Sequence, residues 1–261
     1  MDLSTARHAF ITGGASGIGL GIADALAARG LAVTLADIDA EALAEVVAAR
    51  GPAFRGVVLD TRDREGWISA RDEAEAQAKP VDVLVNNAGI APDGKLWSEA
   101  DPDSFDRIIA INLTGVFNGV WAFAGAMRAR GRGHIVNTSS QAGLAASMPG
   151  VGAYSVAKFG VTALSENLRK ELAGSGVGVS VLCPGLVQTN LGRNTAKISG
   201  VVRSENLEMP PSDVTPAAVG RMVVRGIEAD APYIITHKSA WRGQEDRFAA
   251  IRQACDMAEG T

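Results

Sequence analysis

Two side chains that can share a proton lie four positions apart in the stretch Tyr154-Ser155-Val156-Ala157-Lys158. The apolar residues that follow predict a helix, and positions i and i+4 of a helix lie on one face. A free phenol has a pKa of about 10, and a neighbouring ammonium favours its ionised form. Tyr154 beside Lys158 is therefore a candidate general acid and base. The same pair also occurs on helices that have no function.

Two further polar residues can join this pair. Ser140 follows a predicted strand at 134–138 and can donate a hydrogen bond to a carbonyl oxygen beside the phenol. Asn112 falls inside a long predicted helix, where asparagine is a poor helix former. It either satisfies a kink in that helix or holds a water that relays protons to Lys158.

A glycine-rich segment, Gly13 to Gly19, joins a predicted strand at 8–12 to a predicted helix that ends before Gly30. Glycines let a backbone approach a ligand, and a helix N-terminus offers free N–H groups and a positive dipole end to a pyrophosphate. The pattern indicates a dinucleotide site. An ordinary glycine-rich turn is the alternative interpretation.

The next predicted strand, at 32–36, ends in Asp37. A carboxylate at this point can accept hydrogen bonds from the adenosine ribose and would repel a 2′-phosphate. No Lys or Arg lies within 13–19 or directly after Asp37, so the sequence favours NAD over NADP. The alternative is that Asp37 caps the following helix together with Asp39.

An alternation of strands and helices positions these residues. Strands are predicted at 8–12, 32–36, 54–59, 81–85, 134–138, 177–182 and 233–236, and helices at 22–29, 40–50, 63–78, 101–130, 154–172 and 215–230. Such alternation implies right-handed crossovers and a parallel sheet. We expect an α/β fold: a Rossmann-type doubly wound parallel sheet in three α/β/α layers, one domain over residues 1–261. Ligands bind at the carboxyl ends of such strands.

Two regions lie outside this alternation. The irregular segment 186–214 is predicted to be a substrate lid, with an unstructured surface loop as the alternative. The tail, 240–261, carries Trp241, Phe248 and Ile251 at helical spacing, which indicates a helix docked on this or another subunit.

Composition narrows the class of protein. A chain of 261 residues with 47% hydrophobic residues suits one domain with a large core. A net charge of −4 argues against nucleic acid or an anionic membrane as a partner. Two cysteines, Cys183 and Cys255, and three dispersed histidines give no disulfide framework and predict no metal site. No targeting segment or membrane-spanning apolar run is evident, so we expect a cytoplasmic protein.

Taken in order, the motifs resemble those of the classical short-chain dehydrogenase/reductase family over nearly the whole chain. They are Thr12-Gly13-x-x-x-Gly17-x-Gly19, Asn86-Asn87-Ala88-Gly89, Asn112, Ser140, Tyr154-x-x-x-Lys158 and Pro184-Gly185-x-x-x-Thr189. One departure is Thr61 after Asp60, where the family commonly has an aliphatic residue. Another is the loop from Ser140 to Tyr154, which is one residue longer than in several relatives.

The resemblance implies a catalytic set of Asn112, Ser140, Tyr154 and Lys158. Tyr154 would exchange the substrate proton, Lys158 would lower its pKa and bond the nicotinamide ribose, and Asn112 would hold a water. Implied cofactor-binding residues are Gly13, Ser16, Gly17, Ile18, Gly19, Asp37, Asp60, Thr61, Asn86, Ala88, Gly89, Tyr154, Lys158, Pro184, Gly185, Val187 and Thr189. Substrate contacts are expected from Ser140, Gln141, Tyr154 and Leu186. The family also forms homodimers or homotetramers through helices that start near Asp101 and Ala153.

The expected function is that of an NAD-dependent oxidoreductase that interconverts a secondary alcohol and a ketone. The candidate pocket residues are mainly small or apolar, which suits a medium-sized substrate. Strand 233–236 and the tail are loosely similar to those of short-chain dehydrogenases that act on lignin-derived aryl alcohols. Two alternatives are an NAD-binding regulator without catalysis, and a lyase or epimerase that retains its NAD.

Overall fold

The structure, a computed structural model, describes residues 1–146, 148–189, 191–199 and 212–258. Within these residues, seven parallel strands form one sheet in the order β3-β2-β1-β4-β5-β6-β7. The strands are β1 (His8–Thr12), β2 (Ala32–Asp37), β3 (Phe54–Val58), β4 (Val83–Asn86), β5 (Gly133–Thr138), β6 (Val177–Cys183) and β7 (Tyr233–Ile235). The strand order reverses between β1 and β4, which is where such sheets bind ligands. The predicted doubly wound parallel sheet is confirmed.

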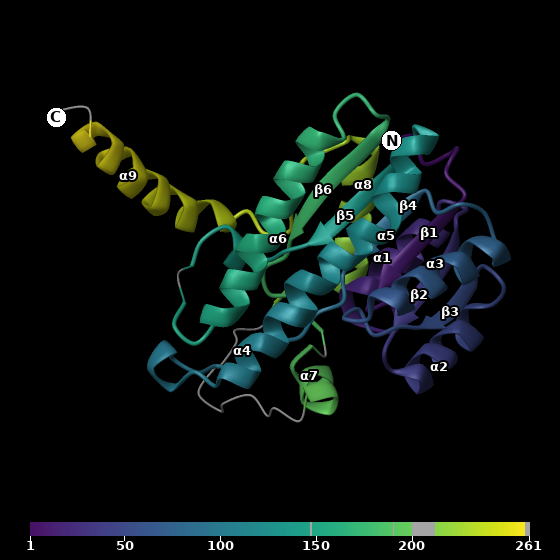
Figure 1. The fold of residues 1–261 in the computed structure, drawn as a ribbon, viewed down its shortest axis with the longest axis horizontal. Coiled ribbons are helices and arrows are strands. Elements are labelled where there is room, and N and C mark those ends of the chain that lie inside the picture. Colours follow the sequence, from purple (N-terminus) through teal and green to yellow (C-terminus); the bar gives the residue numbers. More distant parts are fainter. Residues whose placement is uncertain (147, 190, 200–211, 259–261) are drawn as a thin grey trace.

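Helices cover both faces of this sheet (Figure 1). They are α1 (Gly17–Ala27), α2 (Ala40–Arg50), α3 (Arg64–Gln77), α4 (Pro102–Ile109), α5 (Gly115–Arg130), α6 (Gly152–Glu171), α7 (Leu191–Ser199), α8 (Pro216–Glu228) and α9 (Ala240–Ala258). Leu26 of α1 and Val223 of α8 pack into the core on one face. Trp67 of α3 and Phe123 of α5 pack into the core on the other. The three-layer arrangement is therefore the predicted one.

Acidic caps begin several of these helices. Asp39 accepts a hydrogen bond from the Ala42 amide at the start of α2, and Asp101 precedes Pro102 at the start of α4. A side-chain oxygen at this position satisfies a backbone N–H that has no partner inside the helix. Asp39 is therefore the cap of α2, while Asp37 accepts a hydrogen bond from the Asp39 amide just before the helix and so supports its start without capping it.

Three aromatic side chains pack together in the core between the sheet and helices α3 and α5, next to the ligand-binding ends of the strands. The ring centroids of Phe10 and Phe123 are 5.2 Å apart, and those of Phe10 and Trp67 are 5.9 Å apart. The indole N–H of Trp67 donates to the carbonyl oxygen of Thr61 at 2.9 Å. Buried aromatic packing thus holds the loop that carries Asp60 and Thr61 at the end of β3.

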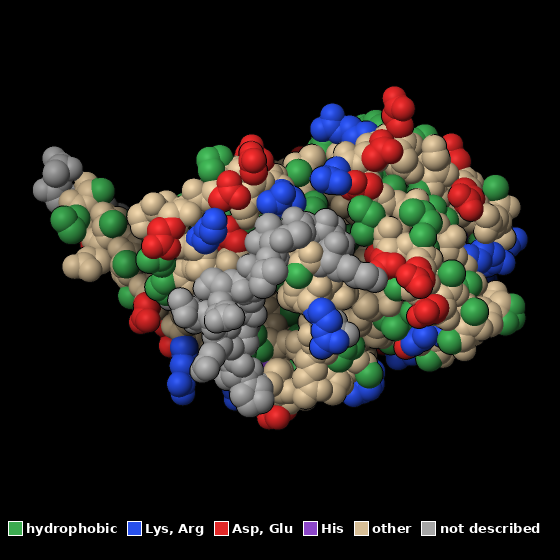
Figure 2. Space-filling model, turned by 90° about the horizontal axis from the view of Figure 1, so that it is seen from below, with side chains coloured by type: hydrophobic (Ala, Val, Ile, Leu, Met, Phe, Trp, Pro, Cys, Tyr) green, Lys and Arg blue, Asp and Glu red, His purple; other side chains and the backbone are tan. Residues whose placement is uncertain are grey.

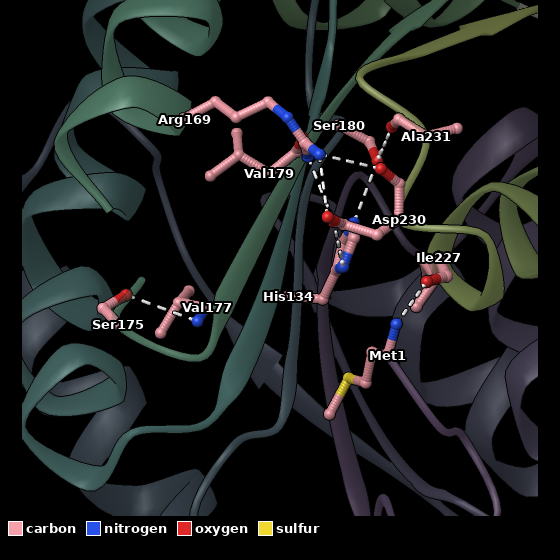
Figure 3. Close-up of polar contacts among 10 residues, drawn as sticks. All are labelled: Met1, His134, Arg169, Ser175, Val177, Val179, Ser180, Ile227, Asp230 and Ala231. Atoms are coloured by element: carbon pink, nitrogen blue, oxygen red, sulfur yellow. Dashed lines mark hydrogen bonds and ion pairs between the residues drawn. The ribbon is translucent and has the colours of Figure 1, made fainter. Parts of the chain in front are cut away.

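A cluster of polar side chains lies on the side of the sheet formed by β5 and β6 (Figure 3). The buried His134 ring of β5 bonds through Nε2 to the Ser180 hydroxyl of β6 at 2.9 Å. Arg169 of α6 makes an ion pair with Asp230 at 2.7 Å and donates to the Val179 carbonyl. Burial lowers the pKa of His134 to about 4, so this ring is neutral near pH 7. The cluster joins β5, β6, α6 and the turn after α8.

The long predicted helix at 101–130 is continuous from Pro102 to Arg130, with one wide π turn at Ala110–Thr114. It is long and apolar enough to cross a membrane, contrary to the expectation that no run approached that length. However, 61% of its most apolar window is buried inside the protein. A buried helix in the core of a globular protein can be equally long and equally apolar.

The segment 186–214 contains a helix, α7, that the sequence did not indicate. Residues 190 and 200–211 of that segment lie outside the described residues. The tail forms a helix as expected, although α9 projects from the body of the molecule for most of its length (Figure 1).

Candidate active site

A cavity of about 770 Å³ lies at the carboxyl ends of the strands. The predicted site residues that line it are Gly13, Ser16, Gly17, Ile18, Asp37, Asp60, Thr61, Ala88, Gly89, Ser140, Gln141, Tyr154, Lys158, Pro184, Gly185, Leu186, Val187 and Thr189. Three others lie behind its surface: Gly19, Asn86 and Asn112. Residues that are far apart in the sequence therefore meet at one edge of the sheet.

The glycine-rich segment, Gly13 to Gly19, lines one end of the cavity. Gly13 and Gly17 have φ values of +62° and +52°, in the left-handed region that favours glycine. A Cβ at Gly19 would lie 2.2 Å from the Gly13 carbonyl oxygen, so no larger residue fits there. Ser16 precedes α1 but makes no capping hydrogen bond to it. The start of α1, at Gly17 and Ile18, lines the cavity, and its first N–H groups are not capped by the Ser16 side chain, which suits a pyrophosphate site.

Two carboxylates stand beside this segment. Asp37 accepts hydrogen bonds from the Ala15 amide at 3.0 Å and from the Asp39 amide at 3.1 Å. Asp60 pairs with Arg62 at 2.6 Å, and hydrogen bonds from Arg62 hold the pKa of Asp60 below its usual value. The positive charge of Arg62 is thus already paired with a carboxylate.

Tyr154, Ser140 and Lys158 converge at the other end of the cavity. The Ser140 hydroxyl lies near enough to the Tyr154 phenol to affect its pKa, and it accepts a hydrogen bond from the Ala142 amide at 3.1 Å. The Lys158 ammonium lies 5.5 Å from the centroid of the Tyr154 ring. It is 3% exposed and donates to the Thr138 carbonyl oxygen at 2.8 Å. The helical spacing has therefore placed both groups on the face of α6 that meets the sheet.

The electrostatics differ from the sequence expectation in one respect. Burial raises the pKa of Tyr154, while the nearby Ser140 hydroxyl opposes that shift. Burial also lowers the pKa of Lys158 to about 8. The expectation that Lys158 brings the pKa of Tyr154 down is not the effect that prevails here. Burial away from water disfavours the charged phenolate, and this desolvation is the largest effect on the Tyr154 hydroxyl.

Asn112 occupies the π turn between α4 and α5 and is fully buried. Its Oδ1 accepts from the Ile90 amide at 2.8 Å, and its Nδ2 donates to the Ile90 carbonyl at 2.9 Å. The sequence left two interpretations of Asn112, namely a residue that satisfies a kink in the helix and a residue that holds a water. The residue does sit at an irregular turn, and its amide clamps the strand-end loop that contains Gly89. A Cβ at Gly89 would lie 3.0 Å from the Asn112 oxygen and 3.7 Å from the Lys158 ammonium.

The sequence profile of the short chain dehydrogenase family matches residues 7–198. The chain belongs to this family. It is an oxidoreductase of the family, whose members bind a nicotinamide cofactor.

Individual relatives agree with this assignment. This short-chain dehydrogenase is 37% identical over 259 residues to a protein named C alpha-dehydrogenase from Sphingobium sp. strain SYK-6, which covers 93% of this chain and 84% of the relative. A short chain dehydrogenase/reductase from Burkholderia phymatum, solved in complex with NAD, superimposes with a TM-score of 0.86 at 30% identity and 97% coverage of both chains. The apo form of LigO from the same Sphingobium strain superimposes with a TM-score of 0.82 at 32% identity, covering 98% of this chain and 91% of that one.

Helix α7 closes one side of the dehydrogenase cavity. Asn194 donates to the Ser16 hydroxyl at 3.0 Å, and the Thr195 hydroxyl accepts from the Ala91 amide at 2.8 Å. These two bonds tie α7 to the glycine-rich segment and to the loop after β4. The described part of the segment 186–214 therefore lines one side of the cavity, and its role as a lid stays a prediction.

Several lining residues were missed by sequence reasoning. They are Arg62, Arg107, Ser239, Ala240, Gly243 and Gln244. Gln244 is the clearest case, because it is 8% exposed and reaches the cavity from the start of α9. A polar residue on the otherwise apolar face of the tail was the available signal. Gln141 was predicted, and its Nε2 is buried without a hydrogen-bond partner among the described residues.

Proposed function

We propose that this short-chain dehydrogenase interconverts a secondary alcohol and a ketone, using NAD. The observation that carries the proposal is the meeting of Ser140 and Tyr154 at the cavity, with the buried Lys158 behind them. A hydroxyl pair of this kind can bind one substrate oxygen and exchange a proton with it.

The residues fit a bound nicotinamide dinucleotide. The N-terminus of α1 and the close approach allowed by Gly13 and Gly17 suit its pyrophosphate. When bound, the cofactor supplies a carbon that accepts or donates hydride. In the oxidation, Ser140 holds the substrate oxygen while Tyr154, ionised to the phenolate, takes the hydroxyl proton. The carbonyl forms as the C–H bond breaks and its electron pair leaves as hydride.

Lys158 contributes through charge and position. A lysine with a pKa of about 8 is mainly protonated at pH 7, so a cation stands beside the phenol as it ionises. Asn112 is assigned a positioning role, because its side-chain amide is bonded to Ile90 on both sides. Any water that it holds would have to use a remaining lone pair of Oδ1 or its backbone carbonyl.

The proposed preference for NAD over NADP rests on the charged side chains at the end of the cavity where the adenosine would bind. Asp37 and Asp60 both line it, and Arg62 is the cation nearest to Asp60. A 2′-phosphate placed there would meet Asp37 directly and would have to break the pair between Arg62 and Asp60. Ribose hydroxyls, by contrast, can donate to a carboxylate.

For the substrate, we propose a medium-sized alcohol that carries an aryl group. The substrate end is lined by apolar residues such as Ile111, Met148 and Leu186, with Gln141 and Gln244 as polar exceptions. The unpaired Gln141 amide would donate to a polar substituent of the substrate. The name C alpha-dehydrogenase of the Sphingobium relative is compatible with oxidation at an α carbon.

We also propose that the protein is a homodimer or homotetramer. Phe117 and Trp121 on α5 are 44% and 52% exposed, and Val156 on α6 is 45% exposed. These side chains lie on the helices that the family resemblance assigned to subunit contacts. A monomeric mass by light scattering at micromolar concentration would contradict this proposal. A cytoplasmic location stays a prediction.

The function is tested by mixing the purified protein with NAD and a panel of aliphatic, steroidal, sugar-derived and aryl secondary alcohols. We expect aryl alcohols to produce NADH, with much lower rates for Tyr154→Phe and for NADP. The phenylalanine variant keeps the ring packing and removes only the hydroxyl. Binding of NADH without turnover of any alcohol would favour the regulator. Isomerised or cleaved substrate with copurified NAD and no net NADH would favour the epimerase or lyase.

A further inference from the structure

Most of helix α9 projects as an arm from the rest of the described structure. Its 19 residues span about 28 Å at the rise of an α-helix. Near its start, Gln244 is buried against the cavity, and Ala240 and Gly243 are half-buried. From Glu245 to Ala258, every residue of the helix is exposed. In Figures 1 and 2, this part of the helix stands away from the body of the protein.

One face of the arm is apolar. Trp241, Phe248, Ile251 and Cys255 recur at intervals of seven, three and four positions and share a face with Gln244. Trp241, Phe248 and Ile251 are 59%, 52% and 46% exposed. This is the a/d spacing of helices that pair with other helices. A lone helix of this length is marginal in water, so the stripe needs a cover to be stable.

The charges of the arm indicate what covers it. Its acidic and basic side chains balance, three of each, so an anionic membrane surface would not attract it. The seven positions of a helix-pairing repeat are written a to g, and Trp241 and Phe248 take the a positions. Glu245 and Arg252 then fall at successive e positions, and Arg247 falls at the g position between them. Positions e and g flank the seam of a helix pair and set its partner and direction.

These positions discriminate among the ways in which two copies of α9 can pair. A parallel pair would set Arg247 against Arg252 of the partner subunit. An antiparallel pair that puts Phe248 opposite Ile251 of the partner subunit brings Glu245 next to the partner's Arg252, twice by symmetry. Sliding that pair by one heptad either way brings Glu245 against the partner's Glu245, or Arg252 against the partner's Arg252. Only the centred antiparallel register joins opposite charges at both e positions.

We propose that α9 pairs antiparallel with the α9 of a second copy of this chain in that register. Arg247, which stacks 5.3 Å from the centroid of Phe159 on α6, lies on the flank away from Glu245. The body of the subunit therefore occupies one flank of the arm and the Gln244 end of the stripe, and it leaves the stripe from Phe248 onward open to the partner. The pair places Cys255 of the partner subunit opposite Gln244. The far end of one subunit's arm thus lies beside the wall of the other subunit's cavity.

Cysteine cross-linking of the full-length protein tests the register. In the antiparallel pair, Gln244→Cys faces the partner's native Cys255, whereas within one helix the two positions are about 16 Å apart. Mild oxidation should link the subunits of Gln244→Cys into dimers on a non-reducing gel. The unmodified protein and Gln244→Cys/Cys255→Ser should stay unlinked. Dimers linked through Cys255 in the unmodified protein would indicate a parallel pair, and no linkage in Gln244→Cys would also overturn the proposal.

Two further variant sets, both made in the Gln244→Cys protein, test the chemistry of the pair. Phe248→Asp/Ile251→Asp should lower the cross-linking rate at least tenfold, because it charges the seam. Ala250→Asp/Gln253→Asp adds the same charge to the opposite, exposed face and should leave the rate unchanged. Equal losses in both would mean that added charge alone is responsible, which contradicts the proposal.

The charge pairing has its own test. Glu245→Arg and Arg252→Glu should each slow cross-linking on the order of fivefold, and the double exchange should restore it. Failure of the double exchange to restore the rate would rule out this register. None of these readouts needs turnover, so they stand apart from the proposed reaction.

Discussion

Lys158 should weaken the folded protein near neutral pH, although the site depends on it. Its ammonium is 3% exposed and donates a hydrogen bond to the Thr138 carbonyl oxygen. Burial lowers its pKa from 10.5 to about 8. The perturbation that tests this cost is Lys158→Met, which keeps an unbranched side chain of similar length and removes the charge.

The size and sign of the effect follow from the two pKa values. A shift from 10.5 to about 8 corresponds to about 3 kcal/mol at roughly 1.36 kcal/mol per unit. Between these values the unfolded chain holds a proton on this lysine that the folded chain has released. Stability therefore rises with pH in that window. The full cost is present below pH 8 and disappears above pH 10.5.

Urea unfolding followed by circular dichroism measures this cost. We expect the unfolding free energy of the native protein, minus that of Lys158→Met, to rise by about 2 to 3 kcal/mol between about pH 7 and pH 10. The subtraction removes the ionisable groups that do not interact with Lys158. The Thr138 carbonyl loses its donor in the variant, but that loss of about 1 kcal/mol is the same at both pH values.

Lys170→Met is the matched control, because Lys170 is exposed on the same helix. Its difference from the native protein should not change with pH. If the Lys158 difference were equally flat, burial of the ammonium would carry no cost. A difference that falls with pH would mean that the fold stabilises the cation, and the reasoning would be refuted.

Three other outcomes are expected. Asn112→Leu should destabilise the protein by about 2 to 3 kcal/mol in urea unfolding, because the Ile90 amide and carbonyl lose their buried partners; a change under 0.5 kcal/mol would contradict this. Gly19→Ala should abolish NADH binding in a fluorescence titration, since its Cβ would meet the Gly13 carbonyl at 2.2 Å, while Gly125→Ala, which meets nothing within 4 Å, should leave binding intact. Asp37→Ser should lower kcat/KM for NAD by about 10- to 100-fold and that for NADP far less, because a carboxylate that accepts ribose hydrogen bonds is lost; equal losses for both cofactors would argue against its selective role.

Local sequence determined the elements of this protein and the direction of its principal side chains. The four-residue spacing of Tyr154 and Lys158 puts both on one face of a helix in any fold that keeps the helix. Glycine at 13 and 17 was needed because both residues adopt positive φ. Alternation of strands and helices indicated the parallel sheet, and its carboxyl edge located the cavity. These features depend on neighbours in the chain or on general rules of chain topology.

Only the tertiary structure decided how the site is completed and charged. The amide of Asn112 meets Ile90 across 22 positions, and Gln244 enters the cavity from the tail. The direction of the Tyr154 pKa shift also depended on burial, which spacing along one helix does not report. Helix α7 packs over the site through Asn194, which bonds to Ser16 across 178 positions. Such contacts join residues whose separation in sequence carries no periodic signal, and desolvation depends on everything that surrounds a group in three dimensions.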